Sequence, residues 1–292
     1  MEDKTIVLIT GCGKGGIGHE YCKAFADHNC HVIATEVPDR IADLSDLLSI
    51  AADNIEALPL DVSSDKSVLA AVSSIMATHG RIDVVVNNAG VGSAGPLAEL
   101  ALDSIRRAWE INALGALRVV QAVVPHMAGP RGGGHVVNVG SIVRTAVTIE
   151  DPDPAATPWA GSYCASKAYV HTMSDALLVE LRPFGIQVIK VMPGAIKSNF
   201  GASTARALGK QEWKMYRSFE GPIAERARAS QTAKATDAAV FARHVAKRVL
   251  SPRPPREVVY GHMTALFAAL AWSPLWVTDC FFSKRFGLDK KM

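Results

Sequence analysis

The sequence predicts an α/β protein built on a doubly wound parallel sheet, and three observations lead to this prediction. Short apolar runs rich in β-branched residues alternate with segments of helical periodicity at least six times. A glycine-rich turn joins the first predicted strand to the first helix, as in Rossmann-type folds. No linker or repeat interrupts the alternation, so a single domain is expected over residues 1–292.

Length and composition bound the functions to consider. The 292 residues are 49% hydrophobic and 20% charged, which is typical of a globular protein. The net charge of +3, without a basic run, argues against nucleic acid as a partner. Five cysteines without framework spacing, and an acidic N-terminus that leads into a strand, predict an intracellular, cytoplasmic protein without a secretory signal. No Cys/His group has zinc-ligand spacing, so no metal is expected.

The first strand, turn and helix begin the predicted fold. Residues 5–9 are an apolar, β-branched run that indicates a buried strand, and residues 19–28 have helical spacing. The turn between them, Thr10 to Gly18, contains repeated glycines. Such glycines permit a tight turn and let a pyrophosphate reach the free N–H groups of the helix N-terminus. A glycine cluster alone is often only a loop, so the flanking strand and helix give this motif its value.

The second strand, residues 31–35, ends at Glu36, which bears on the choice of cofactor. An acid about 20 residues past the glycines can accept hydrogen bonds from ribose hydroxyls and would repel a 2′-phosphate. Glu36 therefore favours NAD(H), unless it is only a solvated strand end. Lys14 and Arg40 favour NADP(H), because a cation here could bind that phosphate. The balance leans modestly to NAD(H).

The next three strands are predicted at residues 55–60, 82–86 and 134–139. Polar or glycine-containing turns follow them, at the strand ends where open α/β sheets bind ligands. Asp61 follows the third strand, where it could accept from an adenine amino group or help to cap the next helix. Ser141 follows the fifth strand, where it could donate to a substrate oxygen or be a plain turn residue.

Two segments near these strands leave their roles open. The helical pattern of residues 102–127 contains Asn112 among apolar neighbours. Asn112 is therefore either a surface residue or a buried residue that needs hydrogen-bond partners. Residues 144–159 contain several prolines, which predict a surface loop beside the site that could shape substrate access.

Tyr163 and Lys167 are four residues apart on a helix predicted to end near residue 182, so their side chains share one face. A tyrosine hydroxyl titrates near pKa ~10, and a lysine ammonium held close favours the phenolate and lowers that pKa. A phenol tuned in this way can exchange a proton with an alcohol or carbonyl near neutral pH. Taken alone, the pair is an ordinary surface pattern, and its combination with the other motifs favours a general acid/base.

Within the single domain, residues 5–200 are expected to form the dinucleotide-binding and catalytic core, and residues 200–292 the substrate lid with a C-terminal apolar extension. A sixth strand is predicted at residues 186–191 and an edge strand at 257–260, with a helix at 236–250. The less regular helical segment 200–233 contains aromatic residues that either line an apolar pocket or belong to the core.

Residues 263–286 form an apolar tail that Pro274 and Asp279 interrupt. Its uncharged part is short for a transmembrane span of ~20 residues. The favoured role is to cap the substrate pocket or to build a subunit interface. The alternative is an interfacial helix that Trp272, Trp276 and Lys284-Arg285 anchor at a membrane surface.

Together these motifs resemble the short-chain dehydrogenase/reductase family. In the family's order they are Thr10-Gly11, Gly16-Ile17-Gly18, Asp61-Val62, Asn87-Asn88-Ala89-Gly90, Asn112, Ser141, Tyr163, Lys167, Pro193-Gly194 and Ser198, and they cover residues 5 to 200. The resemblance implies that Tyr163 donates and accepts the proton, and that Lys167 tunes its pKa and binds the ribose. It implies that Ser141 holds the substrate oxygen and that Asn112 supports a water-linked proton path. The implied cofactor-binding residues are Gly11, Gly16, Ile17, Gly18, Glu36, Asp61, Val62, Asn88, Ala89, Gly90, Tyr163, Lys167, Pro193, Gly194, Ile196 and Ser198.

Within the family, the chain is similar to a fungal branch that includes the 1-acyldihydroxyacetone-phosphate reductases. The similarity lies in Cys12, the double glycine Gly15-Gly16 and Tyr163-Cys164. The branch uses NADPH and resides on lipid droplets or endoplasmic reticulum, which implies such a peripheral location as the alternative to the cytoplasm. Val37-Pro38 stands where the branch tends to have arginines. This chain is therefore expected to share the ancestry of the branch but not its cofactor or its substrate. The longer glycine motif leaves the roles of Gly13 and Gly15 open.

The expected activity is hydride transfer between a nicotinamide and a hydrophobic secondary alcohol or ketone of lipid, terpenoid or polyketide type. The apolar tail favours a hydrophobic substrate. The alternative is a protein with a non-redox role, either a cofactor-binding regulator or a repurposed enzyme of secondary metabolism. The intact set of Asn112, Ser141, Tyr163 and Lys167 argues against that alternative. The family also implies a homodimer or homotetramer packed through the helices that carry Asn112 and Tyr163.

Overall fold

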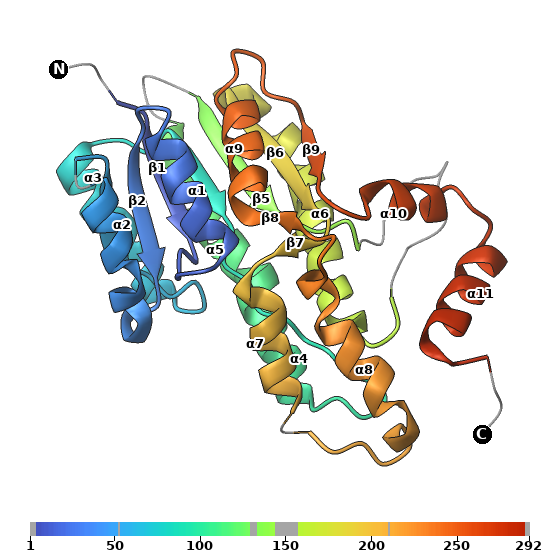
Figure 1. Cartoon of the computed structure of the whole chain (residues 1–292). Coiled ribbons are helices and arrows are strands. Elements are labelled where there is room, and N and C mark those ends of the chain that lie inside the picture. Colours follow the sequence, from blue (N-terminus) through green and yellow to red (C-terminus); the bar gives the residue numbers. More distant parts are fainter. Residues whose placement is uncertain (1–3, 52, 129–132, 144–156, 210, 290–292) are drawn as a thin grey trace.

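A seven-stranded sheet lies at the centre of the protein, and all of its strand pairs are parallel (Figure 1). The structure is a computed structural model that describes residues 4–51, 53–128, 133–143, 157–209 and 211–289. The strands of the sheet are β1 (Ile6–Thr10), β2 (His31–Glu36), β3 (Ile55–Pro59), β4 (Val84–Asn87), β5 (Gly134–Val139), β6 (Ile186–Pro193) and β9 (Glu257–Tyr260). Their order, β3-β2-β1-β4-β5-β6-β9, is doubly wound and confirms the predicted fold class.

Helices cover both faces of the sheet (Figure 1). The helices are α1 (Ile17–Ala26), α2 (Ser45–Ile50), α3 (Asp65–His79), α4 (Leu102–Trp109), α5 (Gly115–Met127), α6 (Gly161–Glu180), α7 (Asn199–Leu208), α8 (Glu220–Ala227), α9 (Ala238–Val249), α10 (Thr264–Ala271) and α11 (Leu275–Phe286). Within β1, Val7 and Ile9 pack with α1 and α9, whereas Ile6 and Leu8 pack with α3, α5 and α6. Successive strand residues point to opposite faces, so a strand buried on both sides is apolar throughout.

Between α4 and α5 the chain forms a π turn, Glu110–Leu114, where the sequence predicted one long helix. The extra residue of a π turn leaves the apolar spacing on either side nearly unchanged, so helical periodicity does not reveal it. Such turns are frequent at functional sites. This one contains Asn112, which is buried. Of the two predicted alternatives, a surface residue and a buried residue that needs hydrogen-bond partners, the second therefore holds.

The C-terminal helices α7, α8, α10 and α11 lie beyond the carboxyl ends of the strands, and with the sheet they enclose a third apolar cluster. The predicted edge strand at 257–260 is β9, and the predicted helix at 236–250 begins two residues later, as α9. The apolar tail is two helices separated at Ser273 and Pro274. Within the described residues, no helix is long and apolar enough to cross a membrane. Most of the predicted loop at 144–159 lies outside the described residues.

The two-residue strands β7 (Ile196–Lys197) and β8 (Thr236–Asp237) pair in parallel and were not predicted. Two residues show no periodicity, so sequence patterns cannot detect such strands. The β7–β8 pair connects the end of β6 to the start of α9. The pair therefore fixes the direction in which the chain leaves β6 and enters α7.

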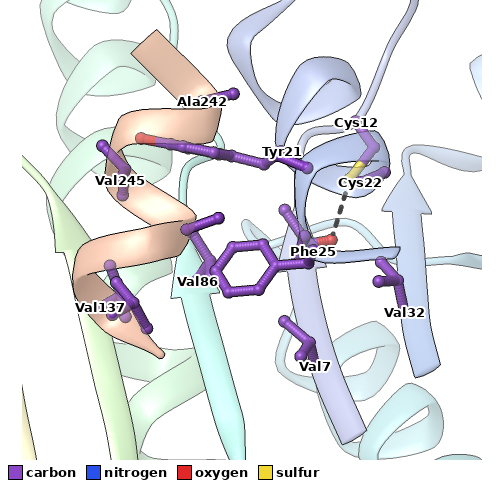
Figure 2. Packing of buried hydrophobic residues seen from close by; sticks show 14 of the residues in the cluster. Val7, Cys12, Tyr21, Cys22, Phe25, Val32, Val86, Val137, Ala242 and Val245 are labelled. Carbon is purple, nitrogen blue, oxygen red and sulfur yellow. Dashed lines mark hydrogen bonds between the residues drawn. The ribbon is translucent and has the colours of Figure 1, made fainter. Parts of the chain in front are cut away.

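The hydroxyl of Tyr21 is a buried polar group in the cluster between α1 and α9. Tyr21 extends from α1 toward α9, beside Ala242 and Val245 (Figure 2). Its side chain is fully buried, and its oxygen has no hydrogen-bond partner among the described residues. Tyr21→Phe should therefore raise the free energy of unfolding by roughly 1 kcal/mol, because it removes an unpaired buried polar group. Urea unfolding of the two proteins measures this difference, and a clear loss of stability in Tyr21→Phe would contradict it.

Candidate active site

A cavity of about 1280 Å³ opens at the carboxyl ends of the strands. The strand order reverses between β1 and β4, and open α/β sheets bind ligands at this point. Pockets for one small ligand are usually about 300 to 1,000 Å³, so this cavity has room for a dinucleotide together with a substrate. It is lined by every residue predicted for the site except Gly18 and Asn112, which lie beneath its surface.

The glycine-rich turn between β1 and α1 forms one end of the cavity. Gly18 packs under the turn, because a Cβ there would lie 2.3 Å from the Gly11 carbonyl oxygen. Gly15, the extra glycine of this motif, has φ +76°, a conformation that L side chains rarely adopt. A Cβ on Gly13 would lie 2.7 Å from the Glu36 carboxylate. Gly13 and Gly15 therefore each have a structural role in the longer turn.

Glu36 is buried at the end of β2 and is fixed by backbone groups. Its Oε2 accepts a hydrogen bond from the Gly13 N–H at 2.7 Å, and its Oε1 accepts one from the Val37 N–H at 3.0 Å. The Arg40 guanidinium lies 3.9 Å from Oε1 and also pairs with Asp43. The Glu36 carboxylate and the Arg40 guanidinium thus meet where an adenosine ribose would lie. The carboxylate is held more rigidly, because two backbone N–H groups bind it.

Lys14 is less well placed for cofactor phosphate than its position in the turn suggested. The exposed fraction of its side chain is 69%, and its ammonium lies 3.5 Å from the Asp46 carboxylate. Lys14 does not line the cavity. Arg40 is therefore the stronger of the two predicted determinants of NADP(H) binding.

The turns after β3 and β4 form the floor of the cavity. Thr10 Oγ1 accepts hydrogen bonds from the N–H groups of Asn88 and Ala89, at 3.1 and 3.0 Å. Asp61 Oδ1 accepts from the backbone N–H and the hydroxyl of Ser63, at 2.9 and 2.7 Å. The N-cap of α3 is Ser64, so Asp61 shapes the turn and lines the cavity without being the cap itself.

Tyr163, Lys167 and Ser141 converge at the other end of the cavity. The Lys167 ammonium donates to the Val139 carbonyl at 2.8 Å and lies 5.9 Å from the centre of the Tyr163 ring. The Tyr163 side chain forms a hydrogen bond with Ser141. The Phe200 ring packs on the Tyr163 ring with their centres 5.5 Å apart. The structure therefore brings together the tyrosine, lysine and serine that the sequence predicted.

Burial changes the pKa of both members of the Tyr163–Lys167 pair. Burial raises the pKa of Tyr163 to about 12, although the hydrogen bond with Ser141 and the charge of Arg226 act to lower it. The same desolvation lowers the pKa of Lys167 to about 8. The predicted lowering of the Tyr163 pKa by Lys167 is therefore wrong for the protein alone. The reason is that the cost of burying a phenolate exceeds the effect of the nearby charges.

Asn112 supports the site from below. Its Oδ1 accepts from the Val91 N–H at 2.8 Å, and its Nδ2 donates to the Val91 carbonyl at 2.9 Å and to Ser166 Oγ at 3.0 Å. Ser166 precedes Lys167 on α6, so Asn112 joins the turn after β4 to the helix that carries the lysine. The water-linked proton path implied for Asn112 stays a prediction.

Two further residues contact the site but belong to no motif. His171 lies two turns after Tyr163 on α6, and its Nε2 accepts from the Ser141 N–H at 3.2 Å. Arg226, on α8, lines the cavity and its charge acts on the Tyr163 hydroxyl. The spacing between Tyr163 and His171 could have placed them on one helix face, whereas nothing in the sequence pointed to Arg226.

The shifted pKa values make stability depend on pH. The pKa of Lys167, about 8, lies below its ordinary 10.5, so between these values the unfolded chain holds more protons and stability rises with pH. The pKa of Tyr163 is raised from 10.0 to about 12, so in that interval the unfolded chain holds fewer protons and stability falls. The free energy of unfolding should therefore rise above pH ~8 by at most about 1.4 kcal/mol per pH unit. It should fall above pH ~9, first because burial also raises the pKa of the Cys22 and Cys30 thiols and then because of Tyr163.

Urea unfolding at a series of pH values measures this profile. Lys167→Met keeps a long side chain but removes the titrating group, so the rising part should disappear while the fall at high pH remains. An unchanged rise in Lys167→Met would assign it to another group.

A separate group of potential metal ligands lies at the opposite ends of the strands. His31, Glu56 and His79 place one ligand atom each within 4.8 Å of one another. They come from β2, β3 and the end of α3, so sequence spacing could not group them. None of the three lines the cavity, and the site described above contains no part of this group.

Comparisons with known proteins agree with this geometry. A sequence model of the short chain dehydrogenase family matches residues 5–209. The short-chain dehydrogenase ptmH of Penicillium ochrochloron is 33% identical over 99% of this chain and 100% of that protein. Human 17-beta-hydroxysteroid dehydrogenase type 1 is 33% identical over 68% of this chain and 58% of that protein. The crystal structure of a short-chain dehydrogenase from Streptomyces avermitilis has a TM-score of 0.77 at 27% identity, covering 97% of this chain and 96% of that one.

Proposed function

Because this chain belongs to the short-chain dehydrogenase family and is an NAD(P)-dependent oxidoreductase, we propose that it interconverts a hydrophobic secondary alcohol and the corresponding ketone. One observation carries this proposal. Tyr163, Ser141 and Lys167 meet at one end of a cavity whose other end is the glycine-rich turn and Glu36.

The residues of the cavity fit a nicotinamide dinucleotide. The glycine-rich turn offers backbone at the N-terminus of α1, where no side chain blocks a pyrophosphate. Glu36 would accept the ribose hydroxyls at the adenosine end, and Lys167 would bind the ribose at the nicotinamide end. The bound nicotinamide would supply or accept the hydride.

The chain's own residues handle the proton and orient the substrate. Tyr163 donates its hydroxyl proton to the carbonyl oxygen in reduction and accepts it in oxidation. Ser141 holds the same substrate oxygen, because its side chain already forms a hydrogen bond with Tyr163. Lys167 is fixed by the Val139 carbonyl beside the tyrosine ring, where its charge favours the phenolate. The Phe200 ring packs on the Tyr163 ring and restricts access of water.

The cofactor that best fits the adenosine end is NAD(H). A buried carboxylate held by two backbone N–H groups cannot easily turn away from a 2′-phosphate. The phosphate would lie beside this fixed negative charge and be repelled. Arg40 offers the opposite charge, but Glu36 and Asp43 already neutralise it.

The substrate class follows from the walls near Tyr163. The third apolar cluster contributes the side chains of Ile142, Phe267, Phe282 and Phe286 to the lining of the cavity. Such walls favour an apolar alcohol or ketone. The human relative is named for a hydroxysteroid, which supports a fairly large hydrophobic substrate.

Turnover of a substrate panel tests the proposal. Steroid, terpenoid and long-chain secondary alcohols are incubated with NAD⁺ or NADP⁺, and the matching ketones with the reduced cofactors. The change in nicotinamide absorbance measures hydride transfer. We expect activity with members of at least one hydrophobic class and little with short polar alcohols. A preference for short polar alcohols would contradict the proposed substrate class.

The faces of α4 and α6 support a homo-oligomer. Trp109 of α4 packs against Tyr169 of α6, and Leu102 of α4 and Val179 of α6 expose 64% and 68% of their surface. Apolar residues on adjacent helices favour association with a second copy. Sedimentation analysis tests this, and a monomer at every concentration would contradict it.

The apolar tail uses its inner face at the cavity. Met263, Phe267 and Phe282 line the cavity, which supports the pocket-capping role. Its outer face exposes 82% of Trp272 and 71% of Trp276. A peripheral membrane contact through residues 263–286 therefore stays a prediction, which binding to phospholipid vesicles would test.

A further inference from the structure

Arg226 is a half-buried cation in the wall of the cavity, and its charge acts on Tyr163. Arg226 projects from α8 into the cavity, and its Nε donates to Thr157 Oγ1 at 2.9 Å. Within the residues that the structure describes, no carboxylate lies within ion-pair distance of its guanidinium. The adjacent Glu225 pairs with Arg285. Arg226 therefore has no negative partner of its own in the described part of the chain.

The surroundings of Arg226 make a positive charge without a negative partner unfavourable in free energy. Its hydrogen-bond partner Thr157 stands two residues before Trp159, and the rings of Tyr216 and Phe219 pack on the Trp159 ring with centres 5.4 and 5.7 Å from its own. Burial lowers the pKa of Arg226, although the tyrosine and thiol groups nearby act to raise it. A guanidinium stays charged in proteins, so it cannot relieve this cost by losing a proton. A desolvated cation of this kind is stabilised by a bound anion.

The geometry of the guanidinium suits an oxygen anion. Nε is occupied by Thr157, which orients the plane and leaves the Nη groups as donors. Two parallel donors match the two oxygens of a carboxylate or of an enolised dicarbonyl. Arg226, Tyr163 and Ser141 line the same cavity, and the charge of Arg226 acts on the Tyr163 hydroxyl, so an anion bound by Arg226 would lie on the Tyr163 side of the cavity.

We propose that Arg226 binds an anionic oxygen of the substrate, so that the substrate is an apolar alcohol or ketone that carries a carboxylate or an enolate near the reacting carbon. This inference rests on the proposed function, because it places the anion in the same cavity as the transferred hydride. The cofactor phosphates are expected at the glycine-rich turn, at the opposite end of the cavity from Tyr163. Arg226 is thus a specificity residue of the substrate end.

Binding of matched acids and esters tests the proposal without turnover. The probes are 2-hydroxydecanoate and 3-hydroxydecanoate with their methyl esters, titrated into protein saturated with reduced cofactor. Alcohol and reduced cofactor cannot exchange a hydride, so calorimetry reports binding alone. At least one acid should bind about 10- to 100-fold more tightly than its ester, as expected for a charge-assisted pair. This preference should vanish in Arg226→Leu and persist in part in Arg226→Lys.

Two controls separate the explanations. Arg206→Leu removes the same charge from an exposed position on the neighbouring helix α7, outside the cavity, and should leave the preference intact. Titration of each variant with the cofactor alone should give unchanged affinity. Loss of cofactor affinity in Arg226→Leu would assign the guanidinium to the cofactor and overturn the proposal.

Other results would also overturn it. Equal affinity of wild type for acid and ester would do so, as would the absence of binding by both acids. An equal loss of acid and ester binding in Arg226→Leu and Arg226→Lys would indicate a structural role. The binding assay needs no hydride transfer. An Arg226-dependent preference for the acid over its ester, in a protein that turns over no substrate, would therefore contradict the proposed function but not the proposed role of Arg226.

Discussion

Replacing Tyr163 by phenylalanine should lower kcat by about a hundred- to ten-thousand-fold and leave cofactor affinity unchanged. The substitution removes the hydroxyl that exchanges the proton. It keeps the ring that packs on Phe200 and lies beside the Lys167 ammonium. Steady-state turnover with an active substrate gives kcat, and fluorescence titration with NADH and NADPH gives cofactor affinity.

Tyr169→Phe is the matched control, because Tyr169 is on the same helix but does not line the cavity. It should keep wild-type turnover. Undiminished turnover in Tyr163→Phe would remove Tyr163 from the chemistry and contradict the proposed mechanism. Because burial raises the pKa of Tyr163 to about 12, the hydroxyl is protonated at neutral pH. Oxidation, which needs the phenolate as base, should therefore speed up as pH rises, and Tyr163→Phe should lose this dependence.

Replacing Glu36 by alanine should change the NADH-to-NADPH affinity ratio by about a hundred-fold or more, in favour of NADPH. A hydrogen bond to a charged acceptor contributes about 1.5 to 3 kcal/mol, so NADH binding should weaken. NADPH binding should strengthen, because the fixed negative charge is gone and Arg40 loses a neighbour 3.9 Å away. Fluorescence titration of wild type and variant with both cofactors measures the ratio.

Glu36→Gln separates charge from the shape of the turn. Its amide oxygen can still accept from the Gly13 N–H, which the carboxylate binds at 2.7 Å, so the turn should keep its form. A similar change of cofactor preference in Glu36→Ala and Glu36→Gln would show that the charge of Glu36 causes the change. Tight NADPH binding by the wild type, unaffected by either variant, would overturn the NAD(H) proposal and assign the choice to Arg40. The Arg40→Ala protein would then lose that affinity.

The central fold could be predicted because its signals are local. Strands buried on both faces, such as β1 and β4, are mostly apolar, and each is followed by a turn with its own composition. The π turn at Asn112 and the β7–β8 pair were missed, because a one-residue insertion and a two-residue strand leave no periodic signal. The division of the chain near residue 200 into core and lid stays a prediction.

The site could be predicted where its residues belong to contiguous motifs. Gly11, Ser141 and Tyr163 each stand at the end of a strand or the start of a helix, where position follows from the topology. Arg226 approaches Tyr163 only because the lid folds back over the sheet. The directions in which the pKa values of Tyr163 and Lys167 shift could not be predicted from the sequence either. They are set by burial, which depends on the packing of segments that no motif connects.

The contact between α7 and the glycine-rich turn links the two ends of the cavity. The first residue of that helix, Asn199, donates its backbone N–H to the Gly15 carbonyl at 2.9 Å and its side-chain amide to the Lys14 carbonyl at 2.7 Å. A movement of the turn when the dinucleotide binds is therefore transmitted to the helix that carries Phe200. Thermodynamic linkage requires such an effect to be reciprocal: any gain in substrate affinity caused by the dinucleotide is matched by an equal gain in dinucleotide affinity caused by the substrate. Any cooperativity between the two ligands would thus pass through two carbonyl groups of one turn.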